Sequence, residues 1–302
     1  FLIAVSGGPD SLALTALAKS YSYENKCKIY YVLVDHNLRK NSSHEAKSVK
    51  KLLKKYQIIL NVLKNKKPIE KNIQSEARVV RYNLLKSFCK KKKIKTILTA
   101  HNLEDQVETF FIRLSRGSGL HGLSSMKQIN KIESNINLIR PLLDFKKIKL
   151  IKISKLIFGK YYKDPTNNNT KYLRTRIRNL QESLETSGIN YDQVIRSIRN
   201  LASSRDTLDQ YFNKIYKNTV NKKNSIIMIN LKNFNKINQE MKMRVFKKAI
   251  KDFTKAYYST RSKKIFNLID KIKAKKNAKL TLGGCIISRE KNHIILKKEI
   301  KN

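Results

Sequence analysis

Tryptophan is absent from this 302-residue chain, and cysteine, proline and glycine are scarce. There are three cysteines, Cys27, Cys89 and Cys285, and they lie far apart with no CxxC pair. An odd number of scattered cysteines argues against a disulfide framework and against an iron–sulfur or zinc cluster. We therefore expect a protein of the reducing cytoplasm.

Long apolar runs are also missing. No run reaches the roughly 18 residues of a membrane-spanning helix, so none is expected. Apolar residues still make up 40% of the chain, which is enough for real cores, and 302 residues favour two domains. The chain opens with a strand-like run at Phe1, so we expect that a few N-terminal residues are missing.

Acidic residues are too few to balance the basic ones. The chain has 66 Lys and Arg against 22 Asp and Glu, a formal net charge of +44. Such an excess predicts a polyanionic partner, whose phosphates would supply most of the binding energy. The alternative is a compositional bias towards Lys, Asn and Ile, with the lysines simply solvated. For any single lysine both interpretations stay open.

A phosphate-binding loop is predicted near the N-terminus. The apolar run Phe1–Val5 leads into Ser6-Gly7-Gly8-Pro9-Asp10-Ser11, and a helix-like stretch follows. Glycines let the backbone approach a phosphate closely, and the start of a helix favours its charge. No Gly-Lys-Ser/Thr follows, so this is not a Walker A loop. Asp10 would repel a phosphate, so we expect a divalent cation between them.

The pattern along the chain predicts the fold class. Residues 1–150 alternate short apolar runs with helical patterns, which is typical of a Rossmann-like parallel sheet with helices on both faces. Strands are expected at 1–5, 28–34, 58–63, 96–100 and 137–140, and helices at 11–20, 43–56, 74–92 and 102–115. A smaller, mostly helical α+β domain should follow, with helices at 191–217, 236–254 and 260–275 and strands at 225–231, 279–287 and 293–298. Gly188 marks the predicted boundary between domains 1–187 and 188–302.

Polar groups follow three of the predicted strands. Ser6 follows the first, Asp35-His36 the second, and His101 a later one. Parallel strands end at one edge of the sheet, where ligands of such folds bind. The sequence therefore predicts one site at this edge.

Acidic residues follow His101. His101, Asp105 and Glu108 are spaced i, i+4 and i+7, so we expect them on one helix face. Together with Asp10 they could hold Mg²⁺, which prefers carboxylates and substrate phosphates. A zinc site is disfavoured because HExxH is absent, and an ordinary acid-rich helix N-terminus is the remaining alternative.

These segments resemble a known family. The loop Ser6–Ser11 resembles the signature of the PP-loop ATP pyrophosphatases, and segment 99–109 resembles the second signature of the tRNA(Ile)-lysidine synthases within them. Further blocks match in the same order: Val34–Arg39, Ala77–Tyr82, Arg116–Leu123, Arg140–Leu143 and Asp164–Asn167. Together they cover most of residues 1–180, and the C-terminal block resembles the family's tRNA-recognition domain.

The resemblance implies a reaction and a set of roles. ATP would adenylate the C2 oxygen of the wobble cytidine in the CAU anticodon of tRNA(Ile), and the lysine amine would then displace AMP to form lysidine. ATP and Mg²⁺ would be the cofactors. The roles implied are pyrophosphate binding by Ser6, Gly7, Gly8, Pro9 and Ser11, adenosine contact by Asp35 or His36, Mg²⁺ binding by Asp10 and Asp105, and catalysis by Asp10, Asp105, His101, Glu108 and Arg78. His101 and Glu108 are both candidates for the proton acceptor.

The positions of two groups of arginines on predicted helices indicate what these arginines contact. On helix 75–88, Val80, Leu84 and Phe88 should face the core, while Arg78, Arg81 and Tyr82 remain available for a phosphate or a base. Arg174, Arg176 and Arg178 fan out on a helix, which favours spread contacts with an RNA backbone. The loop Gly117-Ser118-Gly119 is more typical of a plain connection than of a substrate clamp.

Departures from the family pattern leave rivals open. Relatives commonly carry His-His and Asp-Asp where this chain has His101-Asn102 and Glu104-Asp105, and their Arg-Asn-x-Ile-Arg helix lacks its Asn here. A 2-thiocytidine-type thiolase would need a cysteine pair that the chain does not supply. A catalytically decayed RNA-binding protein would fit the charge, but the retained acids argue against it.

Overall fold

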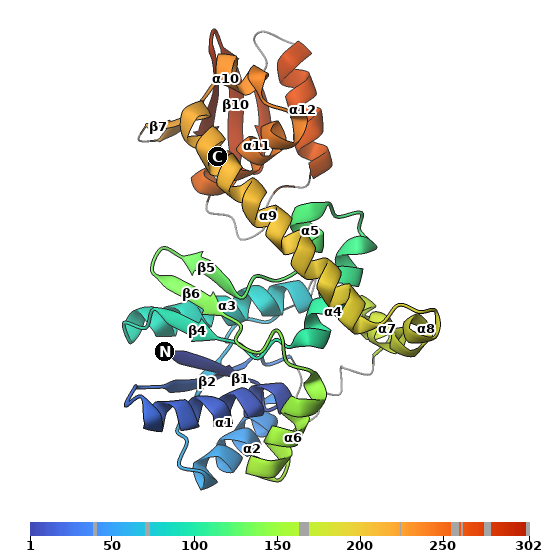
Figure 1. The fold of residues 1–302 in the computed structure, drawn as a ribbon. Coiled ribbons are helices and arrows are strands. Elements are labelled where there is room, and N and C mark those ends of the chain that lie inside the picture. Colours follow the sequence, from blue (N-terminus) through green and yellow to red (C-terminus); the bar gives the residue numbers. More distant parts are fainter. Residues whose placement is uncertain are drawn as a thin grey trace. The chain divides into compact units, whose positions relative to one another are not determined.

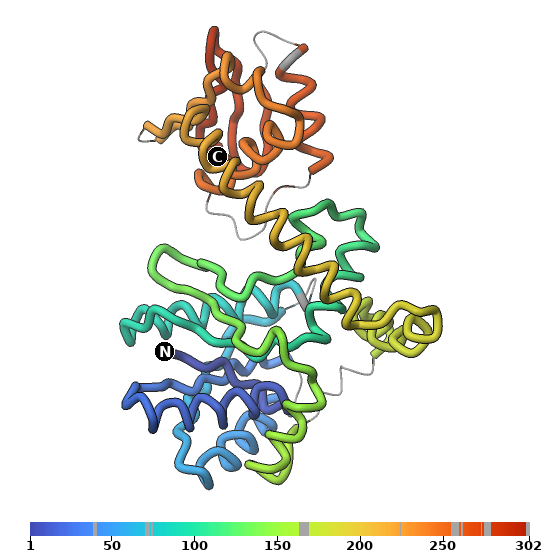
Figure 2. Tube along the Cα trace, viewed as in Figure 1, coloured from blue at the N-terminus to red at the C-terminus, as the bar shows by residue number. Residues whose placement is uncertain are grey.

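The chain forms two compact units in a computed structural model, Phe1–Ala202 and Ser203–Asn302 (Figure 2). The structure describes residues 1–38, 41–69, 73–162, 169–223, 225–254, 260, 262–274 and 279–299. Helix α9, Tyr191–Thr219, begins in the first unit and ends in the second. The functional division at residue 187 stays a prediction. In the described part of the chain, no helix is long and apolar enough to span a membrane.

The first unit is built on a six-stranded sheet in the order β3-β2-β1-β4-β6-β5 (Figure 1). The strands are β1 (Leu2–Val5), β2 (Tyr30–Asp35), β3 (Leu60–Lys64), β4 (Thr96–Leu98), β5 (Ile129–Glu133) and β6 (Ile136–Ile139). All pairs are parallel except that β5 runs antiparallel to β6 at the edge. Leu2 pairs with Tyr30 on one side and with Ile97 on the other, so the strand order reverses at β1. A ligand is expected at this reversal.

Helices cover both faces of this sheet. The helices are α1 (Pro9–Glu24), α2 (Ser42–Lys55), α3 (Ile73–Lys91), α4 (Leu103–Leu114), α5 (Leu120–Leu123), α6 (Lys147–Phe158), α7 (Leu173–Asn179) and α8 (Gln181–Thr186). Side chains of α1, α2 and α6 share one core with Ile3 and Val5, whereas α3 packs on the face that carries Leu2. Successive side chains of β1 point to opposite faces of the sheet, so they contribute to two different cores. Helix α4 packs through Leu103 and Val107 against the first turns of α9.

The second unit contains an antiparallel sheet in the order β7-β8-β11-β10-β9. Its elements are β7 (Val220–Lys223), β8 (Ile226–Asn230), α10 (Leu231–Lys236), α11 (Gln239–Thr254), α12 (Ser262–Ala274), β9 (Lys279–Leu282), β10 (Cys285–Glu290) and β11 (His293–Lys298). Phe246 and Ile265 are fully buried in a core with Ile287. Gly283 and Gly284, with φ of +63° and +79°, form the turn between β9 and β10. Positive φ at both positions is what a tight hairpin turn requires.

The predicted fold class is confirmed, with local differences. The predicted strand 279–287 is a hairpin of two strands, and β5 and α6 were not predicted. Tyr82, predicted to be available to a ligand, is 3% exposed and packs with Leu85 and Cys89. Its ring lies beneath Arg78 and Arg81, whose guanidinium carbons are 5.2 and 5.7 Å from the ring centroid. The core face of α3 thus runs along Tyr82, Leu85 and Cys89. Of the three residues predicted to face the core, Phe88 packs against this cluster. The ring of Tyr82 is buried on one side and contacts the two cations on the other.

Candidate active site

The loop after β1 is shaped by a small hydrogen-bond network. Ser11 Oγ accepts hydrogen bonds from Ser6 N and Ser6 Oγ, both at 3.1 Å, and donates to Gly8 O at 3.0 Å. In α1 the bond from Leu12 N to Gly8 O is the first i to i−4 bond. The N–H groups of Asp10 and Ser11 precede it, so they have no acceptor within the helix. The loop therefore directs backbone donors towards an anion at the carboxyl end of β1.

Gly7 is required by both conformation and space. Its φ is +83°, and a Cβ at this position would lie 2.5 Å from Val49 Cγ2. Tyr162 N donates to Gly7 O at 2.9 Å, so a segment that follows α6 holds the loop from another side. A side chain at residue 7 would be strained and would push the loop off α2.

Asp10 has a carboxylate that is suited to a cation. Burial raises its pKa from 3.8 to about 6; the Lys147 charge lowers it and the Asp105 charge raises it. Its Oδ1 is buried and has no hydrogen-bond partner among the described residues. An unsatisfied buried carboxylate oxygen is costly, and a bound cation would relieve that cost. The position therefore fits Mg²⁺.

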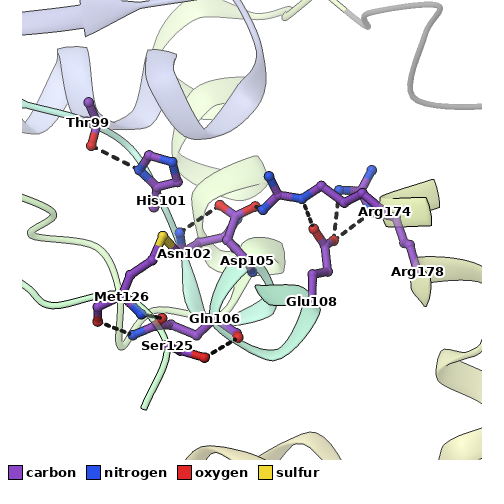
Figure 3. Close-up of polar contacts among 10 residues, drawn as sticks. All are labelled: Thr99, His101, Asn102, Asp105, Gln106, Glu108, Ser125, Met126, Arg174 and Arg178. Carbon is purple, nitrogen blue, oxygen red and sulfur yellow. Dashed lines mark hydrogen bonds and ion pairs between the residues drawn. The ribbon is translucent and has the colours of Figure 1, made fainter. Parts of the chain in front are cut away.

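Asp105 is held at the N-terminus of α4. Asn102 and Asp105 form a reciprocal cap: Asp105 N donates to Asn102 Oδ1 at 2.9 Å, and Asn102 N donates to Asp105 Oδ2 at 3.0 Å (Figure 3). Arg174 Nη2 donates to Asp105 Oδ1 at 2.8 Å. His101 precedes α4 and so does not share a helix face with Asp105, contrary to the prediction. The cap at Asn102 starts α4 at Leu103, so His101 lies before the helix.

Glu108 is bound by two arginines of α7. It is 2% exposed, and its two carboxylate oxygens accept from Arg174 Nε and from Arg178 Nε, the latter at 2.8 Å (Figure 3). Arg174 and Arg178 are four residues apart and share one helix face, whereas Arg176 is exposed. The predicted contact of these arginines with RNA stays a prediction; the structure shows that Arg174 and Arg178 are paired with acidic residues of α4.

His101 lies in a strongly positive environment. Its Nδ1 is 3.0 Å from Thr99 Oγ1. Burial, and then the charges of Arg140, Arg78, Arg174 and Arg81, hold the pKa of His101 well below 6.5. The imidazole is neutral at pH 7 and can hydrogen-bond without adding charge. The arginines supply the positive potential that a polyphosphate needs.

Asp35 and His36 differ in whether their polar atoms have hydrogen-bond partners. Asp35 accepts from Asn37 N at 2.9 Å and from Ser43 Oγ at 2.7 Å. Burial raises the pKa of Asp35, but these hydrogen bonds outweigh it and leave the pKa lowered. His36 Nδ1 is buried without a partner among the described residues, and burial with the Arg81 charge lowers its pKa. Of the two, His36 has the unsatisfied ring nitrogen, while Asp35 holds the start of α2.

Two contacts at this edge were missed from the sequence. Lys147 N donates to both oxygens of Glu104, at 3.0 and 2.9 Å, so Glu104 caps α6 from 43 residues away. The Lys147 charge also acts on Asp10. Sequence spacing gives no signal for a cap at such a distance. Arg39 and the block 164–167, which were part of the predicted motifs, lie outside the described residues.

Carboxylates alone do not complete a metal centre here. Within the described ranges, no group of three or more His, Cys, Asp or Glu side chains is placed to hold a metal ion. Mg²⁺ commonly takes one or two carboxylates and completes its shell with water and substrate phosphates. Asp10 fits that donor set, whereas both oxygens of Asp105 already accept hydrogen bonds from Asn102 N and Arg174 Nη2.

The fold and the loop define a PP-loop protein, and the family described as the PP-loop domain matches residues 1–184. A tRNA(Ile)-lysidine synthase from Wolbachia pipientis wMel is 34% identical over 304 residues, which cover 98% of this chain and 70% of that relative. The chain belongs to the tRNA(Ile)-lysidine synthase family. The resemblance to this family that the sequence motifs indicated is confirmed.

Other relatives agree with this assignment. The tRNA(Ile)-lysidine synthase of Orientia tsutsugamushi (strain Boryong) is 42% identical over 185 residues, covering 60% of this chain and 41% of the relative. Among solved structures, a U34-tRNA thiolase from Methanococcus maripaludis matches with a TM-score of 0.57 and 18% identity, covering 67% of this chain and 71% of that chain. The likeness to the thiolase concerns the fold alone.

Proposed function

We propose that this chain ligates lysine to C2 of the wobble cytidine of tRNA(Ile) with a CAU anticodon. The C2 oxygen attacks the α-phosphate of ATP, and pyrophosphate leaves. The lysine side-chain amine then attacks C2, the C2–O bond breaks, and AMP leaves, so that lysidine remains. Membership of the tRNA(Ile)-lysidine synthase family makes the chain an ATP-using ligase of tRNA modification, and we place it in the cytoplasm.

The assignment of the site rests on Asp10, whose buried Oδ1 has no hydrogen-bond partner among the described residues. Asp10 belongs to the same loop that supplies the backbone donors. We assign Ser6, Gly7, Gly8 and Ser11 to the pyrophosphate, with Pro9 setting the start of the helix. Asp10 and Asp105 would hold Mg²⁺, which would neutralise charge on the phosphates when bound. The loop and the carboxylate then act on adjacent parts of one metal nucleotide.

The remaining residues take roles from their contacts. Arg78 contributes positive charge towards the phosphates beside neutral His101. We assign Glu108 to positioning, because it binds Arg174 and Arg178, and His101 to hydrogen bonding at the reacting groups. His36 rather than Asp35 is placed at the adenosine, because its ring nitrogen is unsatisfied. We further assign residues 1–187 to catalysis and 188–302 to tRNA recognition.

The cysteines do not support the thiolase alternative. Cys89 and Cys285 are buried in different units, and burial raises the pKa of each thiol to about 11. A buried protonated thiol is a poor nucleophile and a poor metal ligand.

Labelled lysine tests the proposed function directly. Purified chain is incubated with labelled lysine and a tRNA(Ile) transcript that has a CAU anticodon, with and without ATP. Label should enter the tRNA only with ATP, and a tRNA(Met) transcript with the same anticodon should stay unlabelled. Tight tRNA binding with neither labelling nor AMP would contradict the enzyme assignment. AMP without lysine transfer would keep the ATP chemistry but contradict the lysine substrate.

A further inference from the structure

The chain between α4 and β5 includes a glycine-rich stretch, residues 115–123, which we call the glycine loop. We propose that the glycine loop is a contact surface for the sugar–phosphate backbone of the substrate RNA, next to the catalytic site. The proposal rests on the proposed function and adds the surface that would hold the strand near the target nucleotide.

The chain just after the glycine loop is fixed by Gln106 of α4. Gln106 Nε2 donates to Met126 O at 3.0 Å, and Met126 N donates to Gln106 Oε1 at 2.8 Å (Figure 3). Ser125 Oγ adds a bond to Gln106 O at 3.3 Å. Gln106 is 8% exposed, so its amide would be costly to bury without these partners. The same helix thus carries Asp105 and anchors this end of the loop.

Two arginines bind backbone carbonyls of the same connection. Arg113 Nη1 donates to Gly122 O at 2.6 Å and to Ser125 O at 2.9 Å. Arg140 Nη1 donates to Lys127 O at 2.7 Å. These bonds fix the Gly122 carbonyl at the end of the glycine loop and the chain that follows it. Contacts of this kind help to preorganise a binding surface.

Gly119 is the N-cap of the short helix α5, where glycine is favoured over alanine or leucine but Ser, Asn or Asp would serve as well. Gly117 has a φ of +63°, which accounts for its glycine, but Gly119 has a φ of −78° that any residue adopts. A Cβ on Gly119 would meet nothing within 4 Å. Backbone conformation and packing among the described residues therefore do not require the side chain to be absent there. A glycine in open space is suited to the close approach of an outside group to the backbone.

The chemistry of the surroundings indicates an anionic partner. Between Glu108 and Glu133 the chain has no acidic residue, while Arg116 is exposed within the loop beside Ser115. Backbone, hydroxyl and arginine groups are the usual contacts of a nucleic-acid backbone. Along α4, the nine steps from Asp105 to Leu114 span about 14 Å at 1.5 Å per residue. The RNA strand that carries the target nucleotide is long enough to lie over both the acids and the loop.

Substitution of Gly119 tests the proposal through size. In Gly119→Ala and Gly119→Leu, affinity for a fluorescent tRNA(Ile) transcript should fall progressively, by about tenfold or more for leucine. The KM for ATP should stay at the wild-type value, and the thermal midpoint should fall slightly and equally in both variants, because both lose the N-cap glycine while neither side chain meets anything in the protein. Arg116→Gln should lower the salt dependence of tRNA binding by about one phosphate contact.

A matched variant and the opposite outcomes complete the test. Lys92→Gln removes the same charge after α3, at the amino edge of the sheet, and should bind tRNA as the wild type does. Wild-type tRNA affinity in Gly119→Leu would overturn the proposal. An equal loss of tRNA affinity in Gly119→Ala and Gly119→Leu would trace the loss to the N-cap rather than to side-chain size and would also overturn it. A raised KM for ATP or lysine with unchanged tRNA affinity would assign the loop to the small substrates instead. Since binding is measured without turnover, failure of lysidine formation is scored separately.

Discussion

At the scale of single residues, Asp10 combines burial with an oxygen that no described residue satisfies. We expect Asp10→Asn to lower kcat for lysine transfer by about 10²-fold or more, since a preorganised electrostatic contact is lost. Binding of tRNA should remain within a factor of about two of wild type, because Asp10 lies in the nucleotide loop and removing an acid there does not weaken phosphate contacts. Single-turnover lysine transfer and tRNA binding measure the two effects. Equal losses in both would contradict a role specific to the nucleotide.

The raised pKa of Asp10 also predicts how Mg²⁺ and pH act together. A folded-state pKa of about 6 against 3.8 means that the folded protein holds this proton more tightly than the unfolded chain. The stability contributed by Asp10 is therefore full below pH 3.8 and is lost as pH rises through about 6. A cation that binds the ionised carboxylate should restore it.

Thermal midpoints measure this linkage. Mg²⁺ should raise the midpoint more at about pH 7.5 than at about pH 5, and this difference should vanish in Asp10→Asn. An equal effect of Mg²⁺ at both pH values in the wild type would count against a cation at Asp10.

Glu108 offers a test of the buried ion pairs. In Glu108→Gln, Arg174 and Arg178 lose their shared charged acceptor, so the free energy of unfolding should fall by about 1–3 kcal/mol. Asp192→Asn is the control, since Asp192 pairs with Lys146 at 3.1 Å between exposed side chains and should change stability by less than about 0.5 kcal/mol. Chemical denaturation measures both. Similar values for the two variants would mean that burial adds nothing at Glu108.

The residues that could be predicted are those whose signal is local. Ser6 to Ser11 and Asp105 were assigned because strand, glycines and acids follow one another within a few positions. The pairing of Glu108 with Arg174 could not be predicted, because it joins side chains 66 residues apart. The i, i+4 spacing of Arg174 and Arg178 is that of a shared helix face, which the predicted fan of all three arginines overlooked.

At the scale of elements, the turn between β1 and α1 depends on a residue without a side chain. Gly7→Ala should weaken ATP binding by at least about tenfold and lower the free energy of unfolding by about 1–3 kcal/mol, because φ is +83° and the new Cβ meets Val49. Calorimetric ATP titration and chemical denaturation measure these effects. Adding Val49→Ala should recover only the steric part. Full recovery in the double variant would show that the backbone conformation costs little.

Elements that end on local signals were predicted closely, and the others were not. The strand His293–Lys298 was predicted with the bounds it has, from its short apolar run. The edge strand β5 is largely exposed, so it lacks the apolar pattern of a buried strand. Helix α6 has no side-chain cap of its own and takes one from Glu104, which leaves no start signal in its neighbourhood.

At the scale of the whole molecule, the net charge of +44 gives a measurable salt dependence. If six to ten phosphates are contacted, tRNA affinity should fall roughly 10³- to 10⁵-fold between about 50 and 200 mM salt. The KM for ATP should change far less over the same range. Titration of fluorescent tRNA at several salt concentrations measures the slope. A slope that corresponds to only one or two phosphate contacts would favour the alternative, in which most lysines are merely solvated.

The hydrogen bond from Tyr162 to Gly7 has a consequence for synthesis on the ribosome. The loop leaves the ribosome before the segment that holds the Gly7 carbonyl, because that segment is made more than 150 residues later. The second partner of β1, strand β4, is likewise made only after α1, β2, α2, β3 and α3. Long-range contacts of this kind form late in folding. The capacity to bind a nucleotide is thus gained near the end of the synthesis of the first unit, although its sequence signature is made well over a hundred residues earlier.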